Sequence, residues 1–174
     1  MNRLSPEEFR RSEKVPIVVV LDRVRSLYNV GSVMRTADAM ALEAVYLCEI
    51  TATPPHPEIH KTALGAENTV EWKYFQHTLD AVKELRERGY EIWSVEQCEG
   101  STPLQNIEYK VNTKQKIAII LGNEVKGVQQ EVINSSDGCI EIPQFGTKHS
   151  MNVSVTAGMV IWHLCCKQVV DKCR

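Results

Sequence analysis

The sequence of 174 residues predicts an α/β fold, an open and mostly parallel β-sheet with helices on both faces. The first observation is two continuous apolar runs, "PIVVVLD" at 16–22 and "KIAIILG" at 116–122, which suit strands buried on both faces. The second is the alternation of such runs with segments whose apolar residues recur at helical spacing. The length and the lack of a linker-like stretch indicate a single domain over 16–174.

The pattern places the elements in a definite order. Residues 1–15 read as a charged, partly helical arm ahead of the domain. Strands are expected over 16–22, 44–50, 70–75, 90–96, 116–122 and 139–143. Helices are expected from residue 29, near 58–64, and over 78–89, 128–136 and 152–170. Because ligands bind at the carboxyl ends of the strands in such sheets, the loops after residues 22, 96, 121 and 142 should carry the chemistry.

The first of these loops leads into the stretch "YNVGSVMRTADA" at 28–39. Asn29 is expected to cap the helix, since its side chain can accept a hydrogen bond from a free N–H of the first turn. Gly31 weakens a helix relative to alanine, which indicates that something approaches the backbone there. Arg35 lies beside the apolar face. The plain alternative is a capped helix with a solvated arginine.

Composition favours a globular protein in a reducing compartment. Hydrophobic residues make up 43% and charged residues 24% of the chain. No apolar run reaches membrane-spanning length, and the polar start lacks the apolar core of a secretory signal. The six cysteines form no CxxC pair, so free thiols in the cytoplasm are expected.

Two familiar sites are excluded by the residues present. The loop "LGNEVKG" at 121–127 has the glycine spacing of a phosphate-binding loop, but Val128 and Gln129 replace the lysine and hydroxyl residue that such a loop needs. His56, Glu58 and His60 provide too few ligands for a metal, and no metal is expected. His149 reads as a solvated loop histidine.

Three segments together resemble a known family. "NVGSVMRTADA", "LGNEVKG" and "IPQFGTKHSMNVSVTAG" stand in the order and approximate spacing of the three motifs of the SpoU family of RNA ribose methyltransferases, within the SPOUT superfamily. The resemblance covers about residues 16–165, and "ALGAENTVEW" at 63–72 is similar to the tRNA-type members. It implies a sheet whose C-terminal part forms a deep trefoil knot, an exception to the general absence of knots.

The resemblance also implies the cofactor, S-adenosylmethionine, held in the knotted loops largely by backbone groups. The positions carried over for it are Glu96, Gln97, Leu121, Gly122, Ile142, Ser150 and Met151. Gly122 is expected to let the cofactor lie against the backbone, where a Cβ would intrude.

The implied reaction is methyl transfer to a ribose 2′-OH of RNA. The catalytic positions carried over are Arg35, Asn29, Glu124, Ser150 and Asn152. A guanidinium is essentially always protonated, so we expect Arg35 to fix a phosphate and stabilise the developing alkoxide rather than act as the base. Glu124 is expected to hold Asn29 and Arg35 or to neutralise positive charge near the sulfonium, with a helix-start carboxylate as the alternative. Asn152 is expected to touch cofactor or substrate, or simply to cap the last helix.

The implied partners are RNA and a second copy of the chain. tRNA is preferred over rRNA because of segment 63–72, and phosphate contacts are expected from Arg10, Arg11, Arg25 and Arg35, although such a basic stretch is often only a solvated face. The helix at 152–170 is apolar on all sides, which indicates burial against a partner and hence a homodimer. The rival interpretation is a non-catalytic RNA-binding protein that retained the fold.

Overall fold

The structure, a computed structural model, describes residues 4–107, 115–147 and 150–172, so His149 lies outside the described residues. The strands are β1 Val15–Asp22, β2 Leu42–Cys48, β3 Glu71–Phe75, β4 Tyr90–Val95, β5 Thr102–Pro103, β6 Lys116–Leu121 and β7 Gly138–Glu141. The helices are α1 Pro6–Arg11, α2 Leu27–Ala39, α3 Pro57–Ala63, α4 Thr78–Glu87, α5 Gln130–Asn134 and α6 Val153–Lys172, with the 3-10 turns η1 Ala66–Asn68 and η2 Leu104–Asn106.

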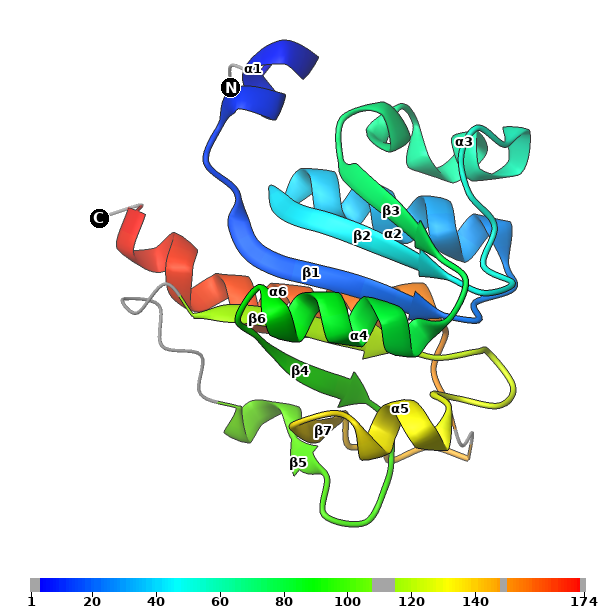
Figure 1. The fold of residues 1–174 in the computed structure, drawn as a ribbon. Coiled ribbons are helices and arrows are strands. Elements are labelled where there is room, and N and C mark those ends of the chain that lie inside the picture. Colours follow the sequence, from blue (N-terminus) through cyan, green and yellow to red (C-terminus); the bar gives the residue numbers. More distant parts are fainter. Residues whose placement is uncertain (1–3, 108–114, 148–149, 173–174) are drawn as a thin grey trace.

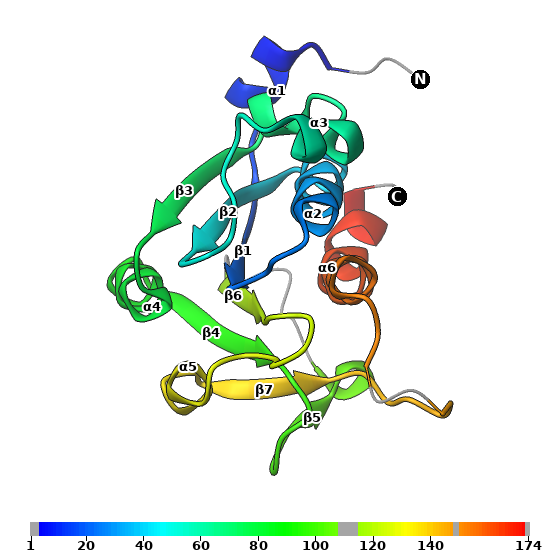
Figure 2. The same ribbon diagram turned by 90° about the vertical axis from the view of Figure 1, so that its right-hand side faces the viewer.

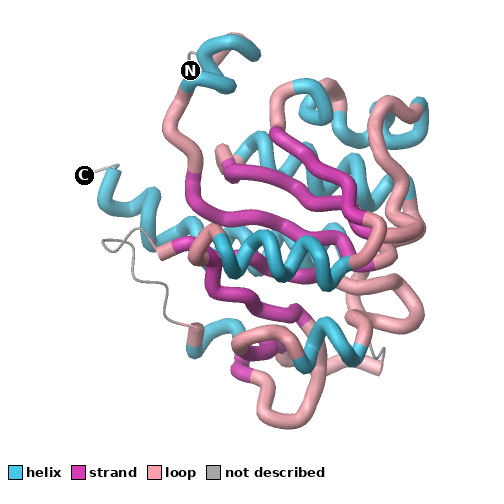
Figure 3. The backbone as a smooth tube through the Cα atoms, viewed as in Figure 1, coloured by secondary structure: helices cyan, strands magenta, loops and turns pink. Residues whose placement is uncertain are grey.

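The strands form one seven-stranded sheet in the order β3-β2-β1-β6-β4-β7-β5, and every pairing within it is parallel. Figure 1 shows the strands running side by side, and Figure 3 separates the layers by colour. In Figure 2, α2, α3 and α6 lie on one side of the sheet and α4 and α5 on the other. The predicted α/β sheet with helices on both faces is therefore confirmed.

The apolar run of β1 explains why the sheet is buried on both sides. Ile17, Val19 and Leu21 join the core beneath α2 and α6, whereas Val18 and Val20 join the core beneath α4 and α5. All five side chains are fully buried. A strand covered on both faces must be apolar at successive positions, which is the pattern that predicted it.

The predicted elements are found within a few residues of their expected bounds, as is usual for element ends. The prediction missed β5, η1 and η2, each of which is at most three residues long. Such short pieces carry too few residues to show a period. None of the helices in the described part of the chain is both long and apolar enough to cross a membrane.

The predicted start of α2 was wrong. The helix begins two residues earlier, at Leu27, and its cap is Ser26, whose hydroxyl accepts a hydrogen bond from the Asn29 N–H. Asn29 lies inside the first turn and is only 7% exposed. The approach predicted at Gly31 is confirmed, because a Cβ there would lie 2.3 Å from the Ile59 carbonyl of α3. The glycine thus allows α2 and α3 to pack closely.

The N-terminal segment contains the expected helix, α1, and contacts the domain. Ser5 caps α1 in a capping box with Glu8. Phe9 is buried, and the Arg10 guanidinium donates a hydrogen bond of 2.8 Å to the Asn68 carbonyl. Arg11 is exposed. One arginine of the segment is therefore partly used in holding it against η1.

Candidate active site

A cavity of about 330 Å³ opens at the carboxyl ends of β4, β6 and β7. It lies where parallel α/β sheets bind their ligands. Its lining comprises Val95, Glu96, Gln97, the whole loop 121–127, Ile140, Glu141, Ile142, Gln144, Ser150, Met151, Val153 and Thr156. The structure thus brings together at one cavity all seven positions predicted for a cofactor.

A chain of hydrogen bonds joins the three sequence motifs beside this cavity. The Asn29 side-chain amide donates to a Glu124 carboxylate oxygen over 3.1 Å, and the Asn152 amide donates to the Asn29 side-chain oxygen, also over 3.1 Å. Asn152 additionally caps α6, because its side-chain oxygen accepts from the N–H groups of Ser154 and Val155. Both roles weighed for Asn152, a helix cap and a member of the site, are compatible in this geometry.

Glu124 is fixed by the loop that precedes α2. Its carboxylate accepts hydrogen bonds from the backbone N–H groups of Arg25, at 3.0 Å, and Ser26, at 2.9 Å. Desolvation of the carboxylate raises its pKa, but these backbone bonds and the Asn29 amide together outweigh that effect, so the pKa of Glu124 lies below its usual value. Glu124 therefore stays ionised at neutral pH.

Arg35 is not part of this cluster. It is exposed on α2 and forms no hydrogen bond or ion pair within the described ranges. The expectation that Glu124 holds Arg35 is therefore not met in the single chain. Ser150 is also exposed and lines the cavity without a hydrogen-bond partner in the part of the chain that the structure describes. The Arg25 side chain is exposed, while its backbone serves Glu124.

Gly122 has a structural reason beyond the one predicted from the sequence. A Cβ at Gly122 would lie 2.1 Å from the Gly127 carbonyl carbon and 2.1 Å from the Val128 nitrogen. The close approach is thus to the loop's own backbone, whose ends are tied by hydrogen bonds between Asn123 and Gly127. A larger residue at position 122 must disturb the loop, whatever it does to a ligand.

The cavity wall carries an excess of negative charge. Glu96, Glu124 and Glu141 line it, against the single cation Lys126 among the described residues. Glu96 is already engaged, accepting the N–H of Gln97 and that of Val128, each over 3.0 Å. Together with the exposed loop backbone, this arrangement suits a ligand with a positive centre and several hydrogen-bonding groups.

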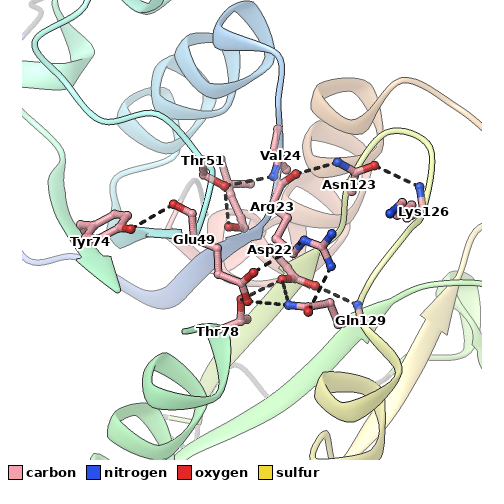
Figure 4. Close-up of polar contacts among 11 residues, drawn as sticks. Asp22, Arg23, Val24, Glu49, Thr51, Tyr74, Thr78, Asn123, Lys126 and Gln129 are labelled. Carbon is pink, nitrogen blue, oxygen red and sulfur yellow. Dashed lines mark hydrogen bonds and ion pairs between the residues drawn. The ribbon is translucent and has the colours of Figure 1, made fainter. Parts of the chain in front are cut away.

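Sequence reasoning missed a buried polar cluster beneath the loop (Figure 4). Asp22, at the end of β1, is fully buried and accepts hydrogen bonds from the Thr78 hydroxyl at 2.7 Å, the Gln129 backbone at 2.8 Å and the Gln129 side chain at 2.8 Å. Glu49 shares the Gln129 amide and pairs with Arg23. A carboxylate that directly follows a buried apolar run was the available signal, since buried charges need partners.

The histidines of segment 56–60 have structural partners. The His56 ring accepts a hydrogen bond from the Glu58 N–H and so caps α3, while His60 contacts Glu67. In the described parts of the chain no group of three or more His, Cys, Asp or Glu side chains is placed to hold a metal ion.

The chain has a parallel α/β sheet with a polar cavity at the carboxyl ends of its strands. This arrangement is typical of α/β ligand-binding domains. Within that class, the chain belongs to the SpoU rRNA Methylase family, which it matches over residues 16–162.

Curated relatives carry both rRNA and tRNA names. The chain is 34% identical over 147 residues to the "23S rRNA (guanosine-2'-O-)-methyltransferase RlmB" of Neisseria meningitidis, covering 84% of this chain and 56% of that protein. It is 27% identical over 156 residues to the "tRNA (guanosine(18)-2'-O)-methyltransferase" of Thermus thermophilus, covering 90% and 77%. The chain thus spans little more than half the length of the Neisseria relative.

Solved structures share the fold. An AdoMet-bound rRNA methyltransferase from Sinorhizobium meliloti superposes with a TM-score of 0.81 at 26% identity, covering 95% of this chain and 61% of that one. The TrmH/SpoU tRNA modifying enzyme of A. aeolicus superposes with a TM-score of 0.82 at 22% identity, covering 96% and 82%.

Proposed function

We propose that the protein is an S-adenosylmethionine-dependent methyltransferase that acts on a ribose 2′-OH of RNA. The observation that carries this proposal is the hydrogen-bonded chain Glu124–Asn29–Asn152, which links the three motifs beside the cavity. The names of the relatives, rRNA and tRNA 2′-O-methyltransferases, support the same reaction.

The residues that line the cavity suit the proposed cofactor by charge and by hydrogen-bonding groups. Glu96, Glu124 and Glu141 would offset a sulfonium and an ammonium charge, and the loop 121–127 would offer backbone groups to the rest of the molecule. Gln97, Leu121, Ile142, Ser150 and Met151 would complete the holding surface, as expected from the motifs. Bound there, S-adenosylmethionine supplies an electrophilic methyl group; a neighbour with this fold is described as AdoMet bound.

The chain's own residues then position the ribose and stabilise its oxygen. Arg35, which stays protonated, would hold a phosphate and stabilise the alkoxide that develops at the 2′ oxygen, while the hydroxyl proton passes to a nearby phosphate or to water. Asn29 is held by Glu124 and Asn152, and its proposed role is to orient the ribose or the arginine. Ser150 lines the cavity and Asn152 is bonded to Asn29, and their proposed role is to contact the cofactor or the substrate.

For the substrate we propose tRNA first and rRNA second. Segment 63–72, which carries the tRNA-type similarity, forms the end of α3, η1 and the start of β3. Arg10, Arg11 and Arg25 are the proposed phosphate contacts, with Arg35 at the reacting nucleotide; Arg11, Arg25 and Arg35 are exposed, and Arg10 retains N–H groups beyond the one that contacts Asn68.

We further propose a cytoplasmic homodimer with the C-terminal trefoil knot of the family. Support for the dimer comes from α6, where Val155, Met159 and Trp162 are exposed, Trp162 by 61%. Trp162→Lys should convert a dimer into a monomer in sedimentation velocity. Ile50→Lys, which changes an equally exposed residue outside α6, should leave the dimer intact.

The test of the activity is methyl transfer from labelled S-adenosylmethionine to unmodified tRNA and rRNA. Label is expected in alkali-resistant dinucleotides, because a 2′-O-methyl group blocks cleavage of the adjacent phosphodiester. RNA binding without transfer to either RNA would favour the rival, a non-catalytic RNA-binding protein. Transfer to rRNA alone would reverse the substrate order.

A further inference from the structure

The loop 122–129 is held from two sides by two carboxylates. The Val128 N–H donates to Glu96 over 3.0 Å, and the next N–H, that of Gln129, donates to Asp22 over 2.8 Å. Glu96 follows β4 and Asp22 ends β1, and these strands flank β6, from which the loop emerges. A carboxylate at the end of each strand that flanks β6 therefore accepts one of two successive backbone N–H groups of the loop.

Asp22 is itself fixed by buried donors. One carboxylate oxygen accepts from the Thr78 hydroxyl and the Gln129 side chain, and the other accepts from the Gln129 backbone. The Gln129 amide reaches Glu49 as well, over 2.7 Å, and Arg23 donates to the Gln129 side-chain oxygen over 3.1 Å (Figure 4). A fully buried carboxylate surrounded by donors has little freedom to move.

Residues 122–127 of the same loop belong to the longest continuous run of residues that line the cavity. Residues 121–127 line the cavity, and Glu124, which orients Asn29, projects from the loop. Asn123 closes the loop by accepting the N–H groups of Val125 and Lys126, each over 3.0 Å, and donates to the Arg23 carbonyl over 2.8 Å. The height of the loop above the sheet thus sets both the cavity width and the place of Glu124.

We propose that Asp22 is a positioning residue for cofactor binding: with Glu96 it suspends the loop 122–129 between β1 and β4 and holds the cavity open. This inference rests on the proposed function for the identity of the ligand. Asp22 lies beneath the loop, is absent from the cavity lining and has no solvent exposure, so it acts only through Gln129.

A matched pair of variants isolates the backbone bond. Gln129 has a φ of −60°, which proline adopts without strain. Gln129→Pro and Gln129→Ala both lose the side chain, but only the proline variant loses the N–H that Asp22 accepts. We expect the Kd for S-adenosylhomocysteine, measured by calorimetry, to be about tenfold higher in Gln129→Pro than in Gln129→Ala, equivalent to about 1.4 kcal/mol.

Two further readouts separate positioning from loss of stability. The methyl-transfer rate at saturating cofactor should differ less than about threefold between the two variants, because the catalytic groups re-form once the loop is occupied. In the cofactor-free proteins, amide exchange at Val125 and Lys126 should be faster in Gln129→Pro than in Gln129→Ala.

Equal Kd values and equal exchange rates in the two variants would overturn the inference. If Gln129→Pro does not fold, Asp22→Asn takes its place: the asparagine amide would face the Gln129 amide donor, and the same rise in Kd is expected. Absence of S-adenosylhomocysteine binding by the unaltered protein would instead refute the proposed cofactor, and the exchange measurement would still test the suspension of the loop.

Discussion

Asn29 and Arg35 lie on the same helix and have opposite surroundings. Asn29 is 7% exposed and held by Glu124 on one side and Asn152 on the other. Arg35, six positions later, is exposed and without a polar partner among the described residues. A single chain therefore already organises one side of the proposed site, the loop 122–129 with Glu124 and Asn29. For Arg35 we expect a partner from outside the chain, RNA or a second subunit.

Replacement of Arg35 should have the largest effect on the reaction. Arg35→Ala should lower the single-turnover rate of methyl transfer by about 10³-fold, the scale expected when a group that stabilises a developing oxyanion is lost. Since Arg35 supports nothing within the described chain, the melting temperature and the Kd for S-adenosylhomocysteine should stay unchanged. Weak cofactor binding by the variant would place Arg35 on the organised side and contradict the contrast with Asn29.

A substitution that disturbs the loop 122–129 should reduce the stability of the protein. Gly122→Ala forces a Cβ to within 2.1 Å of the Gly127 carbonyl carbon. We expect the free energy of unfolding in urea to fall by about 1–3 kcal/mol. Gly146→Ala is the control, because a Cβ there meets nothing within 4 Å. Equal stability of the two variants would show that the loop is not rigid.

Glu124 connects the organised loop to Asn29. The effect of replacing Glu124 on methyl transfer should therefore be smaller than that of replacing Arg35, and it should appear in both substrate binding and rate. In Glu124→Gln the amide group must face at least one of the three donors from Arg25, Ser26 and Asn29. We expect kcat/KM for methyl transfer to fall about 30-fold, or about 2 kcal/mol. Glu131→Gln, an exposed change on α5, should stay within about twofold of the unaltered protein.

The pH dependence should show the smallest effect. The pKa of Glu124 lies below the ordinary value of 4.5, so its contribution to stability is complete above that pH and disappears as the pH falls through the lower, folded-state pKa. In this acid range the free energy of unfolding in urea should therefore fall more steeply with decreasing pH for the unaltered protein than for Glu124→Gln. Parallel curves would indicate that the carboxylate gains nothing from its backbone donors.

Much of the fold could be predicted from local patterns. The runs at 16–22 and 116–122 are apolar at successive positions because both faces of a parallel sheet are covered, and that pattern survives in the sequence alone. The positions that the motif similarity carried over for a cofactor do line one cavity at the carboxyl edge of the sheet. The apolar runs are a local signal, and the motif similarity gathers information from many positions of the chain.

The remaining features depend on contacts that the local sequence does not reveal. Asn29 looks like a helix cap, but the cap is Ser26, and the Asn29 side chain instead bonds Glu124, 95 positions away. The same holds for Gly122, whose near neighbour is the loop's own backbone, and for Asp22, whose partner Gln129 is 107 positions away. Side-chain pairs at such separations are set by the fold as a whole.

The most direct test of the contrast between Asn29 and Arg35 is a pair of double-mutant cycles in single-turnover methyl transfer. One cycle combines Asn29→Ala with Glu124→Gln, and the other combines Asn29→Ala with Arg35→Ala. We predict a coupling energy of at least about 1 kcal/mol in the first cycle and less than about 0.5 kcal/mol in the second, since only the first pair is in contact. Strong coupling between Asn29 and Arg35, with none between Asn29 and Glu124, would contradict this account.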